Sequence, residues 1–276
     1  ELVADIRENE KPDAVIVVSH NGTDVDIKMA QRIVGIDAIF GGHTHDGMPE
    51  PVEVKNAGGM TLVTNAGCSG KYIGVTDLEI KGHKVVGYKH KMMPIFTNLV
   101  KPDAEMTSFI TKMRGTKYDE AVVEARSKSA SNSLERLGKT YDEILSEKLC
   151  TTEQTLYRRG NFMGTWDQVL CNSLREEHDS DFSFSAGVRW GTSVPAGHDV
   201  TMEDLMTNTA MTYGETYSAD ITGEELKATI EGVAENLFQL DPYLQSGGDM
   251  VRVGGLDYTI DPREKLGNRV SDMRDD

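Results

Sequence analysis

The stretch that decides the fold is residues 13–47, where two segments of similar design, DAVIVVSHNG at 13–22 and IDAIFGGHTHDG at 36–47, flank a helical pattern. Each segment starts with a short apolar run, which predicts a buried β-strand, and ends in a loop that carries glycine and histidine. Residues 24–34 carry apolar side chains at helical spacing, with Asp24 available as the N-cap. Strand, helix and strand over about thirty residues predict a βαβ unit, whose parallel strands end at the same edge of a sheet.

Three of the seven histidines stand where these two strands are expected to end. His20 follows the first strand, and His43 and His45 lie on the Gly-Gly loop after the second. Glycines remove the Cβ atoms that would crowd such a loop, so the imidazoles can turn toward a shared ligand. Imidazole suits manganese, iron or zinc in hydrolytic sites. We therefore expect the three side chains to converge on a metal; the alternative is that His43 and His45 are surface loop histidines.

Composition narrows the classes of function. A chain of 276 residues has enough material for two domains or one large one. Its 29 basic and 45 acidic residues give a net charge of −16, which argues against a general nucleic-acid binder because such a protein needs a basic face. No run of about eighteen apolar residues is present, so we expect no membrane span.

The cysteines and the first residue add two expectations. Cys68, Cys150 and Cys171 form no Cys-x-x-Cys pair and offer no zinc-knuckle spacing. Their odd number leaves at least one thiol free, and we expect all three to be buried or inert, with a reactive Cys68 as the alternative. Residue 1 is a glutamate close to the first expected ligand, so we interpret the chain as an internal piece of a longer protein.

The part after the second histidine loop alternates short apolar stretches with glycine and asparagine. From Met60 to about Phe96 these stretches predict consecutive strands in antiparallel pairs, with one hairpin turning at residues 81–83. We expect His83 and His90, which lie on this hairpin, to face solvent.

The composition of the sequence changes at Pro102. Residues 102–127 are charged and helix-forming, with acidic residues in the first turn, and residues 127–133 are small and polar. A helix followed by a polar connection predicts a boundary between two domains.

The second half of the chain has a globular pattern again. We expect a helix over 161–177, a short strand over 181–185, a brief helix from Thr201, a longer helix over 222–238 and a tight strand pair within 246–258. Two of these helices start with a capping box, formed by Thr201 with Asp204 and by Thr222 with Glu225.

Six motifs together resemble the 5′-nucleotidase-like metallophosphoesterases, and within them the SoxB-type sulfur-oxidation thiosulfohydrolases. They are SHNG, GGHTHDG, NAGCSGKYIG, RRGNFMGTWDQ, SAGVRWG and the helix that begins TGEEL, and they run from about residue 13 to the C-terminus. The resemblance implies an α/β fold in three parts. These are the C-terminal part of a metallophosphoesterase α/β sandwich at 1–99, a linker helix and connection at 100–137, and a 5′-nucleotidase C-terminal-like α/β domain, incomplete at its C-terminus, at 138–276.

Carried over by position, His20, His43 and His45 match metal ligands of this family, which binds two divalent metal ions, manganese in this branch. The family's other ligands and its catalytic histidine lie in upstream motifs, and none of those motifs occurs in this chain. The resemblance therefore places the catalytic residue upstream of residue 1. We expect the 276 residues alone to bind metal weakly and to be inactive.

In the second domain the resemblance implies four substrate-binding candidates, Arg159, Arg189, Trp190 and Tyr213. Arg189 lies where nucleotidases place an arginine for the substrate anion, and a guanidinium suits a tetrahedral oxyanion such as phosphate or sulfonate. A loop salt bridge is the alternative for Arg189. Arg158 and Arg159 are weaker candidates, since one of them can simply brace the domain. Tyr213 starts a Tyr-Gly-Glu segment where nucleotidases carry Phe-Gly-Asn for the nucleoside, and that departure favours a substrate without a purine ring.

The implied function is a hydrolase that releases sulfate from a cysteine S-thiosulfonate on a sulfur-carrier protein, in the periplasm. The carrier presents this group on a flexible C-terminal cysteine arm, and neither nucleic acid nor a membrane is an expected partner. The alternatives are a 5′-nucleotidase or related phosphoesterase that uses the same metals and, in another class, a non-catalytic module that docks a partner.

Overall fold

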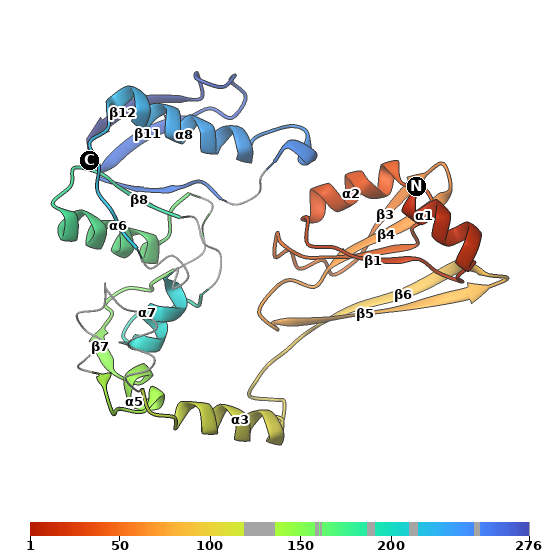
Figure 1. Cartoon of the computed structure of the whole chain (residues 1–276), viewed down its shortest axis with the longest axis horizontal. Helices are drawn as coiled ribbons and strands as arrows, with labels where there is room; N and C mark the ends of the chain where they lie inside the picture. Colours follow the sequence, from red (N-terminus) through yellow and green to blue (C-terminus); the bar gives the residue numbers. More distant parts are fainter. Residues whose placement is uncertain are drawn as a thin grey trace. The chain divides into compact units, whose positions relative to one another are not determined.

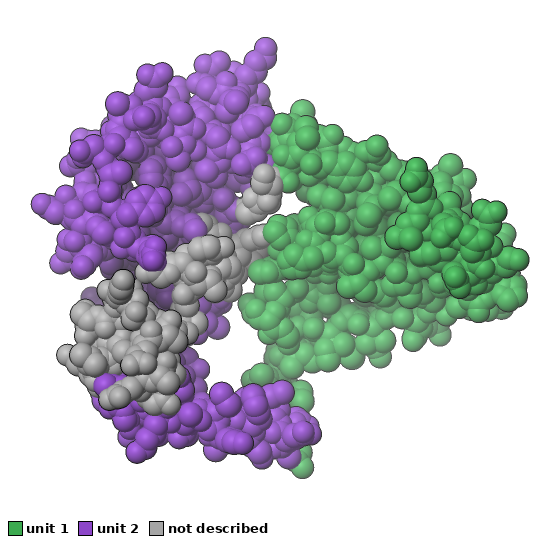
Figure 2. Space-filling model, viewed as in Figure 1, with its two compact units in different colours: residues 1–101, 239–247 green, residues 102–238, 248–276 purple. Residues whose placement is uncertain are grey.

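The computed structural model describes residues 1–118, 136–157, 160, 162–186, 191–209, 215–245 and 249–275. The chain divides into two compact units, coloured green and purple in Figure 2. Unit 1 contains Glu1–Lys101 and Gln239–Gly247, and unit 2 contains Pro102–Phe238 and Gly248–Asp276. In the described part of the chain, no helix combines the length and apolar character needed to cross a bilayer.

Unit 1 is built on a four-stranded sheet in the order β1-β2-β4-β3 (Figure 1). Strands β1, β2 and β4 run parallel, and β3 pairs antiparallel with β4. Its elements are α1 (Leu2–Asp5), the π-helical turn η1 (Ile6–Glu10), β1 (Ile16–Val18), α2 (Thr23–Arg32), β2 (Ala38–Gly41), β3 (Val52–Asn56), β4 (Gly59–Asn65), β5 (Tyr72–Lys81), β6 (Lys84–Pro94) and the 3-10 helix η4 (Pro242–Leu244).

The βαβ unit predicted from the sequence is confirmed. Strands β1 and β2 pair in parallel with Val18 opposite Phe40, and α2 connects them. The helix begins at Thr23 with Gly22 as its N-cap, two residues before the expected N-cap Asp24. Its inner face packs on the sheet in a core formed by Ala30, Ile36, Ile39, Val54 and Val63.

Strand β1 differs from the expected buried strand. Val15 is buried, but Ile16 and Val18 are 47% and 86% exposed. Ile16 and Val18 are two residues apart and so lie on the same face of the strand, and their exposure shows that this face is open to solvent. An apolar run predicts a strand well, but it does not tell whether both faces of that strand are covered.

The antiparallel hairpin β5–β6 forms as expected, with Lys81 opposite Lys84 and a turn at Gly82 and His83 in the left-handed region. The preceding stretch from Met60 does not join it. That stretch is β4, which pairs with β2 and with β3, a strand that the sequence analysis did not anticipate. Placing it in an antiparallel series with the hairpin was therefore wrong.

The two hairpin histidines have different environments. His83 is exposed, as expected, with its Nδ1 2.6 Å from Asp13 Oδ1. His90 is half-buried, its Nδ1 lies 2.8 Å from Thr76 Oγ1, and its Nε2 is buried. The expectation of a solvent-facing His90 was wrong, because the cross-strand contact with Thr76 turns the ring inward.

Unit 1 also includes a segment from far along the chain, residues 239–247. Its helix η4 lies against α2, where the Lys28 ammonium pairs with the Asp241 carboxylate. Lys28 Nζ also lies 4.7 Å from the centre of the Tyr243 ring, and Arg32 Cζ lies 5.3 Å from it. One ion pair and two cation–π contacts therefore hold this segment on the helix.

Unit 2 is a mixed α/β structure whose named strands form three antiparallel pairs, β7 with β9, β8 with β10, and β11 with β12. Its elements are α3 (Ala104–Arg114), α5 (Tyr141–Leu145), β7 (Lys148–Thr151), α6 (Thr165–His178), β8 (Ser183–Ser185), β9 (Asp199–Thr201), α7 (Met202–Asn208), α8 (Gly223–Leu237), β10 (Arg252–Gly254), β11 (Leu256–Ile260) and β12 (Val270–Asp275). Helix α8 packs on the strands around Leu226, Ile230, Ala234, Met250, Val253, Leu256 and Val270.

Several predicted elements of unit 2 are confirmed, among them α6, β8, α7 and α8. Both predicted capping boxes are present, with Thr201 and Asp204 at α7 and Thr222 and Glu225 at α8. The expected tight strand pair within 246–258 was wrong. Strand β10 pairs with β8, which lies far away in the sequence, and strand β11 pairs with β12, the next strand along the chain.

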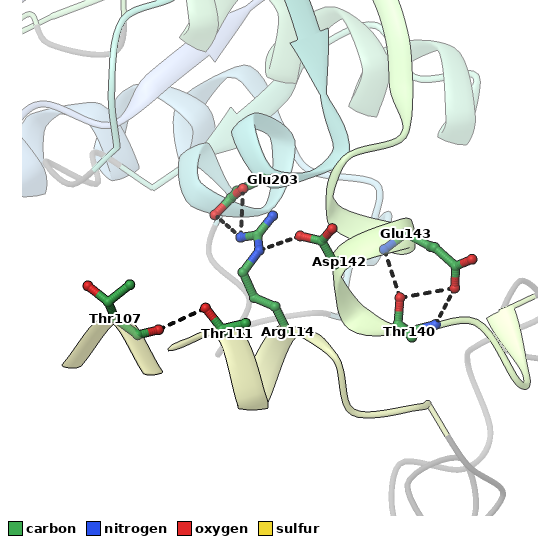
Figure 3. Close-up of polar contacts among 7 residues, drawn as sticks. All are labelled: Thr107, Thr111, Arg114, Thr140, Asp142, Glu143 and Glu203. Carbon is green, nitrogen blue, oxygen red and sulfur yellow. Dashed lines mark hydrogen bonds and ion pairs between the residues drawn. The ribbon is translucent and has the colours of Figure 1, made fainter. Parts of the chain in front are cut away.

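Helix α3 is shorter than the predicted helix. It ends at Arg114, with Asp103 rather than Pro102 at its N-terminal boundary. The Arg114 guanidinium forms two ion pairs within unit 2, at 2.6 Å from Asp142 Oδ1 and at 3.0 Å from Glu203 Oε1 (Figure 3). Residues 119–135, which include the predicted polar connection, lie outside the described residues.

Of the three cysteines expected to be buried or inert, one is confirmed as buried, and the inertness of the other two stays a prediction. Cys171 is buried, Cys68 is half-buried and Cys150 is exposed, and all three are free thiols. Cys150 is exposed because it lies on β7, a strand whose four residues are all open to solvent.

Candidate functional site

The carboxyl ends of β1 and β2 bring two of the predicted metal ligands together. Ser19, which follows β1, donates its backbone N–H to the Phe40 carbonyl at 2.9 Å and extends the parallel register by one residue. The next residues on the two strands are His20 and then, on the other side, Gly42 and His43. The His20 and His43 rings lie edge to face with their centroids 5.3 Å apart.

Glycine makes this approach possible. A Cβ on Gly42 would lie 3.1 Å from His20 Nδ1 and 3.5 Å from the Ser19 carbonyl oxygen. A side chain at this position would therefore push the His20 ring away from its neighbour. The sequence argument that the Gly-Gly pair clears room for imidazoles has a direct structural counterpart.

The loop that carries His43 and His45 has an unusual backbone. Both residues lie in the left-handed region, with φ of 69° and 60°. Residues other than glycine pay of order 1–3 kcal/mol for such conformations, which cluster at functional sites. His45 is half-buried on the same loop.

A hydrogen-bond network supports this strained loop from the start of α2. Thr44 Oγ1 lies 3.0 Å from Thr23 Oγ1, and Thr23 Oγ1 donates to Asp46 Oδ2 at 2.8 Å. On the other side, the Asn65 amide donates to the Gly42 carbonyl at 3.4 Å. Thr44 stands between the two histidines, so fixing its side chain also restrains theirs.

The side chains present fit part of a site for a divalent metal. Two neighbouring imidazoles on a glycine-rich strand end are a donor set that manganese, iron or zinc accepts. No group of three His, Cys, Asp or Glu side chains suited to a metal occurs among the residues that the structure describes. The convergence of His20, His43 and His45 on one metal stays a prediction.

One residue near the strand ends escaped the sequence analysis. Asp26 in α2 is fully buried, and Ser19 Oγ donates to its Oδ1 at 2.5 Å. Burial raises the pKa of the Asp26 carboxyl above its ordinary value, and the hydrogen bond from Ser19 opposes this shift. A signal was available in the sequence, because Asp26 precedes the core residue Ala30 by one helical turn and so shares its inward face.

The four predicted substrate-binding residues, Arg159, Arg189, Trp190 and Tyr213, lie outside the described residues. Their roles stay predictions.

The described part of unit 2 contains a buried arginine that the sequence did not single out. Arg252 Nε lies 3.0 Å from Asp167 Oδ2, and both side chains are fully buried. The guanidinium also donates to the carbonyls of Met250 at 2.7 Å and Gly160 at 2.5 Å. Gly160 directly follows Arg158 and Arg159 in the chain.

Comparison with known proteins shows that this chain is similar to nucleotidases and related hydrolases. Residues 146–276 match the family model described as 5′-nucleotidase, C-terminal domain. The chain is 26% identical to the trifunctional nucleotide phosphoesterase YfkN of Bacillus subtilis, over 98% of the chain and 17% of that protein. It is 25% identical to the 5′-nucleotidase of Rattus norvegicus, over 94% of the chain and 45% of that protein.

Two solved structures of Thermus thermophilus proteins share the fold. The sulfate thiohydrolase SoxB superposes with a TM-score of 0.81 at 29% identity, covering 99% of this chain and 46% of that one. A 5′-nucleotidase precursor superposes with a TM-score of 0.73 at 19% identity, covering 99% of this chain and 51% of that one.

The chain thus spans about half, or less, of the length of these relatives. The resemblance inferred from the sequence motifs is confirmed. Residues 146–276 are a 5′-nucleotidase C-terminal domain, and the chain as a whole matches the C-terminal part of 5′-nucleotidase-like proteins.

Proposed function

We propose that this chain is part of a metal-dependent hydrolase of the SoxB type, which releases sulfate from a cysteine S-thiosulfonate on a sulfur-carrier protein. The observation that carries the proposal is the pairing of His20 and His43 at the ends of two parallel strands, with ring centroids 5.3 Å apart. Ligand and substrate sites in open α/β sheets lie at such strand ends.

Two observations, one from the relatives and one from this sequence, favour a sulfonate over a nucleotide as the substrate. The likeness to the sulfate thiohydrolase combines a TM-score of 0.81 with 29% identity, whereas the likeness to the nucleotidase structure is at 19% identity and supports the fold alone. The sequence also has Tyr213-Gly214-Glu215 where nucleotidases carry a nucleoside-binding Phe-Gly-Asn segment. A carboxylate in place of the amide adds a negative charge and removes a donor for a purine base.

The proposed reaction is the hydrolysis of a sulfur–sulfur bond. A water oxygen attacks the sulfonate sulfur, the bond to the carrier's outer sulfur breaks, and that sulfur leaves with the bonding electrons as a cysteine persulfide. Sulfate is the other product, and the two protons of the water pass to the surroundings. No electron is exchanged with another reactant, so the reaction needs neither an oxidant nor a reductant.

The predicted residues have three roles in this proposal: metal binding, charge neutralisation and contact with the carrier's cysteine arm. His20, His43 and His45 would hold metal through imidazole nitrogens, with two divalent ions, manganese in our proposal, supplying Lewis-acid activation of the water. Arg189 would neutralise charge on the sulfonate oxygens and orient the group. Trp190, Tyr213 and Arg159 would line the path of the carrier's cysteine arm.

The proposed setting is the periplasm, where the carrier's cysteine arm would reach the site. Neither nucleic acid nor a lipid surface is a proposed partner, in keeping with the net charge of −16.

The test compares two substrates with the intact protein after expression with manganese. We expect sulfate release from a carrier loaded with a thiosulfonate and no phosphate release from AMP. His43→Ala should lower sulfate release by at least about 100-fold, because it removes a proposed metal ligand, and loss of even an outer partner of a metal site costs about 10–100-fold. His83→Ala is the matched control, because His83 is exposed on the β5–β6 turn, and it should leave the rate unchanged. Efficient AMP hydrolysis without sulfate release would refute the proposal.

A 5′-nucleotidase is the second candidate, favoured by identities of 24–26% to curated 5′-nucleotidases of mammals over 93–94% of this chain. The third candidate is a non-catalytic module that docks a partner. Metal analysis separates it from both enzymes, since a module with no catalytic role would contain no manganese after manganese-replete expression.

A further inference from the structure

We propose that Asp26 is a positioning residue, whose buried carboxylate sets the spacing between the two strand ends that carry His20 and His43. The inference rests on the proposed function only in taking His20 and His43 as metal ligands. The geometric claim concerns this chain alone and does not depend on which substrate is cleaved.

A single carboxylate touches both strand ends. On the β1 side, Ser19 Oγ donates to Asp26 Oδ1 at 2.5 Å, and Ser19 directly precedes His20. On the β2 side, a Cβ on Gly41 would lie 2.6 Å from Asp26 Oδ2, so this oxygen rests directly against the backbone of the last β2 residue. Asp26 itself is held rigidly, because its backbone N–H donates to the Gly22 carbonyl at 2.9 Å in the first turn of α2.

The carboxylate is a costly way to fill this space. Asp26 is fully buried, and its Oδ2 has no hydrogen-bond partner among the residues that the structure describes. Burying such an oxygen destabilises a fold, whereas an apolar side chain of similar size would fill the same volume without that penalty. A residue with no task beyond packing would not need a hydrogen-bond acceptor here, so we assign the side chain a geometric task at the strand ends.

The geometric effect reaches the imidazoles within one residue on the β1 side and within two residues on the β2 side. Ser19 is bonded to the carboxylate and is followed by His20, while Gly41 rests on it and is followed by Gly42 and His43. A change in the separation of Ser19 and Gly41 therefore changes the separation of the two rings. Ligand pairs must be held within about 0.5 Å of their working geometry, so even a small shift matters.

The test measures ring separation directly in the chain without metal. Histidine labelled with carbon-13 gives the nuclear Overhauser effect between the His20 and His43 ring protons. Asp26→Leu keeps the branching at Cγ but adds volume and removes the hydrogen bond to Ser19, whereas Ser19→Ala removes the same bond without adding volume. We expect this effect to fall at least about twofold, because it varies with the inverse sixth power of the distance between ring protons and a shift of ~0.5 Å or more lengthens that distance. Asp26→Asn retains an oxygen acceptor and should preserve the effect.

Two further variants keep the test decisive if Asp26→Leu fails to fold. Ser19→Ala removes only the hydroxyl on the β1 side, and Gly41→Ala places a methyl group against Oδ2 on the β2 side. Both should weaken the effect while circular dichroism shows an intact fold. Asp24→Asn is the matched control, because Asp24 is exposed on the same helix, and it should change nothing.

An unchanged ring-to-ring effect in folded Asp26→Leu, or in both Ser19→Ala and Gly41→Ala, would overturn the inference. Manganese titration of the unmodified chain then separates it from the proposed function. Suppose that the nuclear magnetic resonance signals of His20 and His43 do not broaden with manganese, while the ring-to-ring effect still depends on Asp26. The geometric inference then holds, and the metal-dependent function loses its support.

Discussion

The buried pair between Arg252 and Asp167 provides the sharpest stability prediction. Both side chains are fully buried, with Nε 3.0 Å from Oδ2. Asp167→Asn removes one charge and leaves a guanidinium in the interior of unit 2. Breaking a buried ion pair in this way costs about 3–5 kcal/mol. Arg252 keeps its bonds to the Met250 and Gly160 carbonyls and its ion pair with Asp249 at 3.4 Å, so we expect the lower end, about 3 kcal/mol.

A second variant separates the ion pair from helix capping. The Gly164 backbone N–H donates to Asp167 Oδ2 at 2.8 Å at the start of α6. Asparagine retains an oxygen that can accept this bond, whereas Asp167→Ala removes it and should cost about 1 kcal/mol more.

Tryptophan fluorescence reports the unfolding of unit 2 separately from that of unit 1. The chain has two tryptophans, Trp166 and Trp190, and both belong to unit 2. With a urea m-value of about 2 kcal/mol/M, a loss of about 3 kcal/mol lowers the midpoint of unfolding by about 1.5 M. Asp257→Asn is the matched control, because Asp257 pairs with Arg274 at the surface at 3.3 Å, and such pairs contribute about 0–1 kcal/mol. If Asp167→Asn shifted the midpoint no further than this control, the buried pair would not have the role assigned to it.

Three further predictions address other parts of the structure. Thr222→Ala should lower the free energy of unfolding of unit 2 by about 1 kcal/mol in urea, because it removes the capping box at the start of α8; no change would mean that the cap is unimportant. Ile39→Ala should lower the opening free energy of β2 amides in hydrogen exchange by about 3 kcal/mol, since Ile39 is fully buried in the unit 1 core; a loss below about 1 kcal/mol would contradict the packing. The side-chain hydrogen bond from Arg263, and after it the backbone hydrogen bond from the same residue, lowers the pKa of Asp261 to about 2. The ionised Asp261 therefore stabilises the fold at pH values above its unfolded-state pKa near 3.8, and this stabilisation is lost as the pH falls from there through about 2. Carbon-13 titration should show this value in the unmodified chain and a return toward 3.8 in Arg263→Gln, and an unperturbed pKa in the unmodified chain would refute the bond.

Local patterns predicted the elements of the candidate site well. The apolar runs before Ser19 and before Gly41, with a helix between them, were sufficient to infer parallel strands that end together. The capping boxes at Thr201 and Thr222 were equally visible, because a capping box is formed by residues three positions apart. Such signals work because the interacting residues are close in sequence.

Interactions between distant residues were not predictable in the same way. Strand β4 pairs with β2 rather than with the hairpin that follows it. Arg252 and Asp167 are 85 residues apart in the chain. Nothing in either local segment identifies the other partner, because burial of both depends on how helices and strands pack.

The sequence by itself determined that two histidine-bearing strand ends lie at one edge of a parallel sheet, and it determined the family that this arrangement resembles. Only the tertiary structure showed that the rings of His20 and His43 meet at 5.3 Å and that the Asp26 carboxylate lies beneath both strand ends. The physical reason is that backbone periodicity follows from neighbouring residues, whereas the contacts of a buried charge follow from close packing between segments that the sequence keeps apart.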